Sequence, residues 1–320
     1  MASETTVKIP KLDFSAPDLK PGTENWVQLR AEVLHAFESY GCFEAVYPRV
    51  STETRQAFFS VLQDLFALPV ETKLRNVSEV PSFGYVGHYP TLPLYESLGI
   101  SHASLPDNVH KFTHLMWPHD NPMFREMVCC LVGKITELEK MVRRMVLESL
   151  GVEKYYESHM ESTDYLLRMM KYKGPEREGF QEGLGAHTDM TMVSILFQNQ
   201  VSGLQVQTKD GEWIPAEISP SSFTVMAGDS FLAWTNGRVH APWHRVMMEG
   251  KEERYSVAVF AMQKAGELVK APEELVDEEH PLLYNPFDAI EYLKYISSGG
   301  KPSKSALNDY CGTHLALRQA

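Results

Sequence analysis

The chain has 320 residues, of which 43% are hydrophobic and 22% charged, a balance that excludes an intrinsically disordered protein and allows a full hydrophobic core. Its formal net charge of −12, with no basic stripe to offset it, argues against nucleic acid and anionic membranes as partners. No apolar run approaches the ~20 residues of a membrane span, and the N-terminal residues lack the pattern of a signal peptide, so we expect a cytoplasmic protein.

The first half of the sequence predicts a mainly helical region. Apolar residues at helical spacing predict one helix that ends near Gly41 and leads into a short strand at 42–47. A second helix is predicted from a cap at 51–52 to a break at Pro69, and a third over about 122–150. We interpret these helices as scaffold.

An irregular segment at 80–108 connects the second and third helices. It is rich in proline, glycine and aromatic residues. Long connections of this kind inside a compact protein commonly serve as binding loops or lids. We therefore expect this segment to cover a pocket.

After about Tyr165 the pattern changes to short apolar runs separated by turns. Turn signals at 209–212 and 235–238 separate runs with the spacing of strands in a β-sandwich or jelly roll. The apolar runs are at 164–172, 190–198, 203–208, 212–218, 222–237, 242–248 and 254–262. We predict helices packed on a β-barrel-like core, in one compact unit without internal repeats.

Three candidate metal ligands lie in this second half. His187 and Asp189 are two residues apart, so in a strand they point to one face, and in a turn they can still converge. His244 begins another short strand. Two imidazoles and one carboxylate form a facial triad, which holds Fe(II) and leaves positions for a chelating co-substrate and dioxygen. The alternative is a His–Asp pair that holds a turn, with His244 an ordinary histidine.

The predicted strand at 254–262 carries an unusual cation. Alternation points Arg254, Ser256 and Phe260 to one face, so a guanidinium enters the predicted barrel. A buried arginine needs an anion, and its planar fork beside a hydroxyl suits a carboxylate. That carboxylate fits a co-substrate whose other end chelates the metal.

The predicted strand at 164–172, like the strand at 254–262, also directs polar side chains to one face. Alternation places Arg168, Met170 and Tyr172 on one face. The Tyr172 hydroxyl is either a donor to the same carboxylate or to a metal-bound oxygen, or it belongs to an ordinary buried tyrosine. We expect Arg168, like Phe260, to line the cavity next to the metal.

These motifs carry a resemblance to a known family. His-Thr-Asp at 187–189, the stretch 203–246 and Arg-Tyr-Ser-Val-Ala-Val-Phe at 254–260 are similar, in order and spacing, to plant Fe(II)/2-oxoglutarate-dependent dioxygenases of specialised metabolism. The segments 41–47 and 65–73 extend the similarity over nearly the whole chain. Within that family the chain resembles the branch containing the alkenyl and hydroxyalkyl glucosinolate-producing enzymes.

The resemblance implies an α+β fold with a double-stranded β-helix, or jelly roll, flanked by N-terminal and supporting α-helices. It divides the chain into a mainly helical N-terminal region, 1–120, and a jelly-roll catalytic region with C-terminal helices, 121–320, within one compact unit. It makes His187, Asp189 and His244 the catalytic iron ligands, and Tyr172, Arg254 and Ser256 the residues that bind 2-oxoglutarate. Met170, where the family has Asn, departs from the pattern but is no metal ligand.

The implied cofactors are Fe(II), 2-oxoglutarate and O2, with ascorbate as a supporting reductant. The implied reaction hydroxylates, dealkylates or desaturates a small specialised metabolite and releases succinate and carbon dioxide, and we expect the enzyme to be a monomer. Resemblance adds Lys111 and Thr113 to the substrate pocket beside Arg168 and Phe260. Two cations in an apolar pocket favour a substrate with an acidic or strongly hydrogen-bonding group on a hydrophobic body, unless both are solvated or paired with local acids.

Two other functions stay open at this point. A binding barrel that has lost catalysis would retain the metal without forming succinate. An oxidase of the same fold would keep Arg-x-Ser without consuming 2-oxoglutarate. A zinc hydrolase is disfavoured, because zinc favours three His or two His and one Glu around one water, and Arg254 would have no role.

Overall fold

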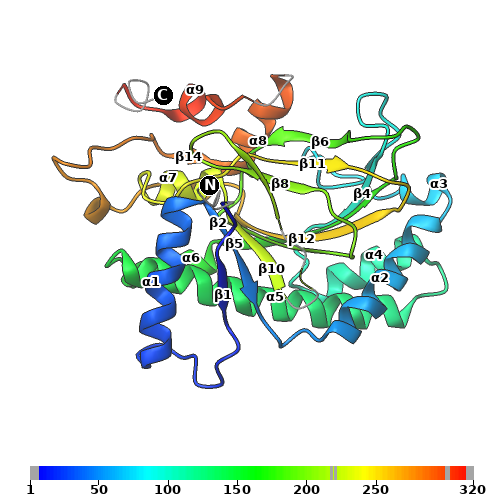
Figure 1. Ribbon diagram of the computed structural model, residues 1–320, viewed down its shortest axis with the longest axis horizontal. Helices are drawn as coiled ribbons and strands as arrows, with labels where there is room; N and C mark the ends of the chain where they lie inside the picture. Colours follow the sequence, from blue (N-terminus) through cyan, green and yellow to red (C-terminus); the bar gives the residue numbers. More distant parts are fainter. Residues whose placement is uncertain (1–6, 217–218, 220–221, 300–302, 315–320) are drawn as a thin grey trace, which may run out of the picture.

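The core of the protein is formed by two β-sheets, as Figure 1 shows. The computed structural model describes residues 7–216, 219, 222–299 and 303–314. The larger sheet has the strand order β1 (Lys11–Asp13), β2 (Cys42–Val46), β10 (Ser222–Ala227), β7 (Val193–Gln198), β12 (Arg254–Gln263), β5 (Thr163–Tyr172), β4 (Tyr95–Ile100) and β3 (Val86–Gly87). The smaller sheet has the order β6 (Gln181–His187), β11 (His244–Met248), β8 (Leu204–Gln207) and β9 (Trp213–Pro215), and β13 (Leu268–Val269) pairs with β14 (Phe287–Asp288).

Helices surround this core and complete the predicted α+β jelly roll. The α-helices are α1 (Glu24–Ser39), α2 (Thr52–Ala67), α3 (Val70–Lys73), α4 (Pro106–Met116), α5 (Pro122–Ser149), α6 (Tyr156–Glu161), α7 (Asp229–Trp234), α8 (Ala289–Ser298) and α9 (Ala306–Cys311), and two 3-10 turns lie at Glu153–Tyr155 and Glu273–Leu275. The long helix α5 runs along the larger sheet, where it packs against β7 and β12 and against α1, α2 and α4 (Figure 1).

The central strands β5 and β12 are buried on both faces. They pair antiparallel over their whole length, from Arg254 opposite Tyr172 to Gln263 opposite Thr163. One face joins the helix-covered core through Leu167, Met169, Val257, Val259 and Ala261. The other face lines a cavity and carries Leu166, Arg168, Met170, Tyr172, Arg254, Ser256, Phe260 and Met262. Strand alternation therefore separates core residues from cavity residues, as predicted.

The three predicted helices are confirmed. α1 ends before Gly41, whose φ of +72° favours glycine, and a Cβ there would lie 2.4 Å from the carbonyl oxygen of His240. Ser51 caps α2 by accepting a hydrogen bond from the backbone N–H of Thr54, and this helix stops before Pro69. α5 covers the third predicted helix almost residue for residue.

Two local expectations differ from the structure, and a third is described only in part. The segment 80–108 is not wholly irregular, because β3 and β4 lie within it and join the larger sheet. The run 222–237 changes from strand to helix at Gly228, so its second half is the short helix α7. The run 212–218 contains β9, and its residues 217 and 218 lie outside the described part of the chain.

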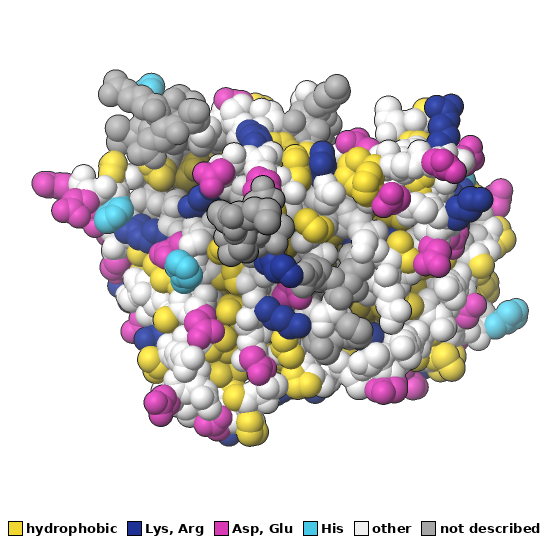
Figure 2. Space-filling view, in the orientation of Figure 1, with side chains coloured by type: hydrophobic (Ala, Val, Ile, Leu, Met, Phe, Trp, Pro, Cys, Tyr) yellow, Lys and Arg dark blue, Asp and Glu magenta, His cyan; other side chains and the backbone are white. Residues whose placement is uncertain are grey.

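The first 120 residues contribute to both edges of the larger sheet. β1 and β2 lie at one edge, and β3 and β4 lie at the other. Across the described residues, the structure contains no helix with the length and hydropathy needed to cross a membrane. On the face drawn in Figure 2, the coloured Lys and Arg side chains are interspersed with Asp and Glu.

Candidate active site

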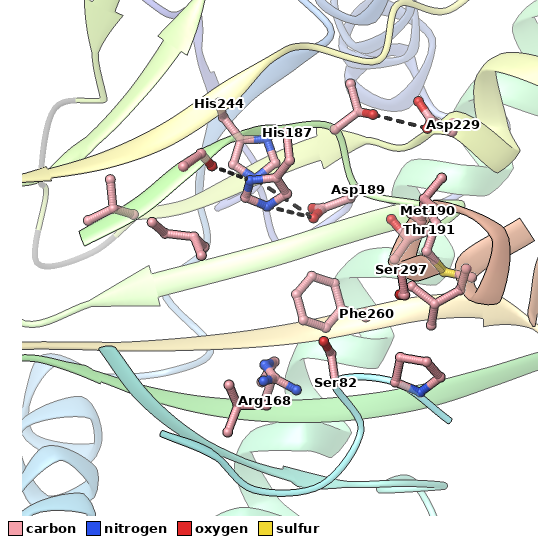
Figure 3. Close-up of a pocket in the computed structure, with 18 of the residues that line it drawn as sticks. Ser82, Arg168, His187, Asp189, Met190, Thr191, Asp229, His244, Phe260 and Ser297 are labelled. Atoms are coloured by element: carbon pink, nitrogen blue, oxygen red, sulfur yellow. Dashed lines mark hydrogen bonds and ion pairs between the residues drawn. The ribbon is translucent and has the colours of Figure 1, made fainter. Parts of the chain in front are cut away.

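His187 and His244 form a cross-strand pair in the smaller sheet, and both line a cavity. His187 is the last residue of β6 and His244 is the first of β11, and the two residues pair in register. Their ring centroids are 4.2 Å apart. The Asp189 Oδ1 lies 3.8 Å from Nε2 of His187 and 3.7 Å from Nε2 of His244. Figure 3 shows both rings directed toward the Asp189 carboxylate; these three residues are called the ligand triad below.

Backbone carbonyls orient both imidazoles. The His187 Nδ1 is 2.8 Å from the Gly185 carbonyl oxygen, and the His244 Nδ1 is 3.4 Å from that of Pro242. A carbonyl can only accept, so Nδ1 carries the hydrogen and Nε2 presents its lone pair to the space beside Asp189. Burial, with His187 alongside, lowers the pKa of His244 to about 4, which keeps its ring in the neutral form that ligates metals.

The donor set of the ligand triad fits a divalent transition metal. One nitrogen or oxygen from each residue lies within 4.8 Å of the others. Distances of 3.7–3.8 Å are too long for hydrogen bonds, so the alternative of a His–Asp pair holding a turn does not describe this geometry. The Asp189 Oδ2 is buried without a hydrogen-bond partner. A metal ion bound to the carboxylate would compensate for this missing interaction. Two nitrogens and one oxygen leave coordination positions open, as iron oxygenase chemistry requires.

A second polar cluster surrounds Arg254 on β12. This side chain is 1% exposed, and its guanidinium carbon lies 4.9 Å from the centroid of the Tyr172 ring. Nη2 donates to the Gln198 side-chain oxygen at 2.5 Å, while Nε and Nη1 have no hydrogen-bond partner. Burial lowers the pKa of Arg254 and raises that of Tyr172, so the phenol keeps its proton and can donate it in a hydrogen bond. With the buried Ser256, the cluster offers several donors and a positive charge, which suits a carboxylate.

The ligand triad and the Arg254 cluster line one cavity of about 1120 Å³. Arg168 and Phe260, predicted from alternation, also line it. The segment 81–95 contributes Pro81, Ser82, Phe83, Val86, Thr91, Leu92 and Tyr95, so its expected role beside a pocket agrees with the lining. The space is large enough for a co-substrate and a second small molecule together.

Lys111 and Thr113 require a correction. Both lie on α4, and neither is among the described residues that line this cavity. Lys111 is exposed, whereas Thr113 is buried with its hydroxyl bonded to the carbonyl oxygen of Val109 one turn earlier. Neither residue therefore contributes to the cavity that the ligand triad lines.

Several cavity residues were not foreseen from the sequence. α8 contributes Tyr292, Leu293, Tyr295 and Ile296. Burial raises the pKa of Asp229 to about 6, although its Oδ2 accepts hydrogen bonds from Tyr292 at 2.7 Å and Thr188 at 3.0 Å. The Asp229 backbone N–H also donates to the Asp189 carbonyl oxygen. A short polar chain thus connects α8 to the loop that carries the carboxylate of the ligand triad.

The jelly roll, the open donor set and the buried arginine together define a non-haem iron oxygenase that takes a carboxylate co-substrate. Comparison with known proteins agrees. A model of the 2OG-Fe(II) oxygenase superfamily matches residues 149–263, and a model of the non-haem dioxygenase N-terminal region in morphine synthesis matches 9–120. The chain belongs to the 2-oxoglutarate-dependent dioxygenases.

Similar proteins support this membership over almost the full chain. The probable 2-oxoglutarate-dependent dioxygenase AOP1.2 of Arabidopsis thaliana is 44% identical over 95% of each chain, and the dioxygenase AOP2 of the same plant is 31% identical over 97% of this chain and 99% of its own. Among solved structures, rice dioxygenase for auxin oxidation has a TM-score of 0.81 at 30% identity, covering 95% of this chain and 100% of that one. JOX2 in complex with 2OG, Fe and JA has a TM-score of 0.80 at 25% identity, covering 96% and 90%. The predicted resemblance to plant dioxygenases is confirmed.

Proposed function

We propose that His187, Asp189 and His244 hold the iron of this oxygenase, and that Arg254, Ser256 and Tyr172 hold the distal carboxylate of 2-oxoglutarate. The observation that carries this proposal is the pair of incomplete polar clusters in one cavity. One cluster offers neutral nitrogen and anionic oxygen donors, and the other offers a buried cation with unpaired N–H groups. When bound, Fe(II) and 2-oxoglutarate supply the oxidative decarboxylation that activates O2 and yields succinate and carbon dioxide.

The residues of the chain have three tasks in this reaction. The backbone carbonyls of Gly185 and Pro242 fix the two imidazoles, so that their Nε2 atoms are set before any ligand enters. Arg254 binds a carboxylate on the cavity-facing side of the larger sheet, and Gln198 holds the guanidinium in position. The apolar lining excludes water and orients the C–H bond that reacts, which decides between hydroxylation, dealkylation and desaturation.

The substrate is a small specialised metabolite in this proposal. Similar structures are named for auxin oxidation or contain JA, and each is a protein acting on or binding a small molecule. We infer in addition that the enzyme works as a cytoplasmic monomer, without nucleic acid. Residues 1–120 serve as a mainly helical N-terminal region that also supplies the edge strands of the larger sheet, and 121–320 as the jelly-roll catalytic region of the same unit.

The proposal is tested with an extract of small molecules from a host plant. Purified protein is incubated with the extract, with and without Fe(II) and 2-oxoglutarate, and mass spectrometry follows which compound disappears. We expect one compound to be consumed only when both are supplied, with one succinate formed per product. Product formation without 2-oxoglutarate would favour the oxidase alternative, and metal binding without any succinate would favour a silent binding barrel.

A further inference from the structure

We propose that Arg168 binds a carboxylate of the organic substrate, which is therefore an acid with an apolar body. The inference rests on the proposed function, because it assigns a second anion site inside the same cavity. Arg168 lies on β5, lines the cavity and is 7% exposed. Its Nε lies 3.2 Å from the Tyr95 hydroxyl and its Nη2 2.6 Å from the Ser97 hydroxyl, and its buried Nη1 has no hydrogen-bond partner.

No acid in the described part of the chain neutralises this guanidinium within ion-pair distance. Arg143, which is also buried, is by contrast paired with Glu139. Glu96, the acid next to Ser97, pairs instead with Lys73 and accepts a hydrogen bond from Tyr85. A buried cation with only neutral partners is costly, and an incoming anion removes that cost.

One molecule of 2-oxoglutarate cannot serve both Arg168 and Arg254. Arg254 stands opposite Tyr172 in the sheet, while Arg168 stands opposite Ala258. Four residues of strand separate the two levels, which places their Cα atoms about 13 Å apart along the sheet. In the proposed function one carboxylate of 2-oxoglutarate is held by Arg254 and the other end is directed to the ligand triad. Neither carboxylate is left for Arg168, which therefore needs an anion of its own.

The surroundings of Arg168 indicate what carries that anion. Phe83, Leu166, Phe260 and Ile296 line the same cavity, so the rest of the ligand meets apolar surface. Figure 3 shows Arg168 on the wall opposite the two histidines, with the Phe260 ring between them. An acid held at Arg168 thus extends its apolar body past Phe260 toward the ligand triad. The carbon that is oxidised belongs to this body and is remote from the carboxylate.

The competing explanation is structural, since the two hydroxyl contacts could serve only to tie β4 to β5. The variant Arg168→Met separates the two explanations, because methionine keeps the unbranched stem as far as the position of Nε and lacks the guanidinium with its charge. A structural tie predicts that the unfolding midpoint falls by several degrees. An unpaired cation awaiting a ligand predicts a midpoint that is unchanged or higher in the absence of any acid.

The binding test uses protein saturated with Mn(II) and 2-oxoglutarate, so that the Arg254 cluster is already filled. The probes are arylalkanoic acids from phenylacetate to phenylbutyrate, each beside its primary amide, and the readout is the thermal unfolding midpoint over a concentration series. For at least one pair, wild type is expected to bind the acid about tenfold or more tightly than the amide. In Arg168→Met the two affinities become equal, and Arg168→Lys keeps part of the preference.

Phe260→Leu is the matched control, since it alters the apolar wall and leaves the cation. It is expected to weaken acid and amide alike and to retain the preference. The inference is overturned if wild type binds every amide as well as its acid, or if the preference survives in Arg168→Met. Failure of the proposed function looks different, because the wild-type protein would then bind neither Mn(II) nor 2-oxoglutarate before any probe is added.

Discussion

Replacing Arg254 by alanine is expected to weaken 2-oxoglutarate binding by roughly 30- to 4000-fold. Truncating one partner of a buried, hydrogen-bonded charge pair costs about 2–5 kcal/mol, and each 1.4 kcal/mol is a factor of about ten. Arg254 is 1% exposed, so bulk water does not replace the lost donors, and Gln198 and Tyr172 bring no positive charge. We therefore expect a value in the upper half of this range.

The measurement is calorimetric titration of 2-oxoglutarate into Mn(II)-loaded protein without oxygen. Arg254→Lys should recover only part of the loss, because an ammonium cannot form two parallel hydrogen bonds to one carboxylate. Arg245→Ala is the control, since Arg245 lies on β11 over the Trp213 ring and does not line the cavity. An unchanged 2-oxoglutarate affinity in Arg254→Ala, together with weaker binding of the organic substrate, would refute the assignment.

Alanine at any position of the ligand triad should abolish metal binding and turnover. The unfolding midpoint of the metal-free protein should stay within a few degrees of wild type, which metal analysis and thermal melts test. A variant with normal turnover would remove that residue from the triad. His159 is buried, both ring nitrogens lack hydrogen-bond partners, and burial beside Arg143 holds its pKa well below the usual value. Below pH about 6.5 the unfolded chain therefore binds a proton that the folded chain does not, so stability falls with decreasing pH, by roughly 1 kcal/mol from pH 7 to 5.5 for this group. Denaturant unfolding of His159→Phe should show a pH dependence smaller by that amount, and an identical dependence would contradict the low pKa. Tyr292→Phe removes a hydrogen-bond donor to the buried Asp229 and should lower the unfolding free energy by roughly 1–3 kcal/mol. Tyr295→Phe is the control, because Tyr295 lies on the same helix but is 43% exposed, and it should lower the unfolding free energy little. Equal losses in the two variants would contradict the role of the hydrogen bond.

The cavity-facing residues of β5 and β12 were predictable because strand alternation is a local property. Arg168, Tyr172, Arg254 and Phe260 line the cavity, as the period of two requires. The convergence of His187 with a histidine on a different strand was inferred from residue type and from resemblance. Only the sheet register shows that these two rings face each other.

The remaining features depend on how distant segments pack. Lys111 was assigned to the pocket from its segment, but on α4 the buried positions include Val109, Phe112 and Met116, and Lys111 points away from them. The lining from α8 could not be read from the sequence, because no local pattern tells which surface an amphipathic helix covers. β6 was missed since its glycines interrupt the apolar pattern, and Gly183 is needed there because a Cβ would lie 2.9 Å from the Tyr172 ring.

The arrangement of the larger sheet has a consequence for synthesis on the ribosome. Glu44 of β2 pairs with Thr224 of β10, about 180 residues later in the chain. At a translation rate of ~5–20 residues per second, β10 is synthesised roughly 10–35 s after β2. β2 pairs early only with the three-residue strand β1, so most of its backbone hydrogen-bonding groups stay available to other chains during that time. The nascent chain is therefore most exposed to aggregation before the second half emerges, and chaperone demand should be greatest in that interval.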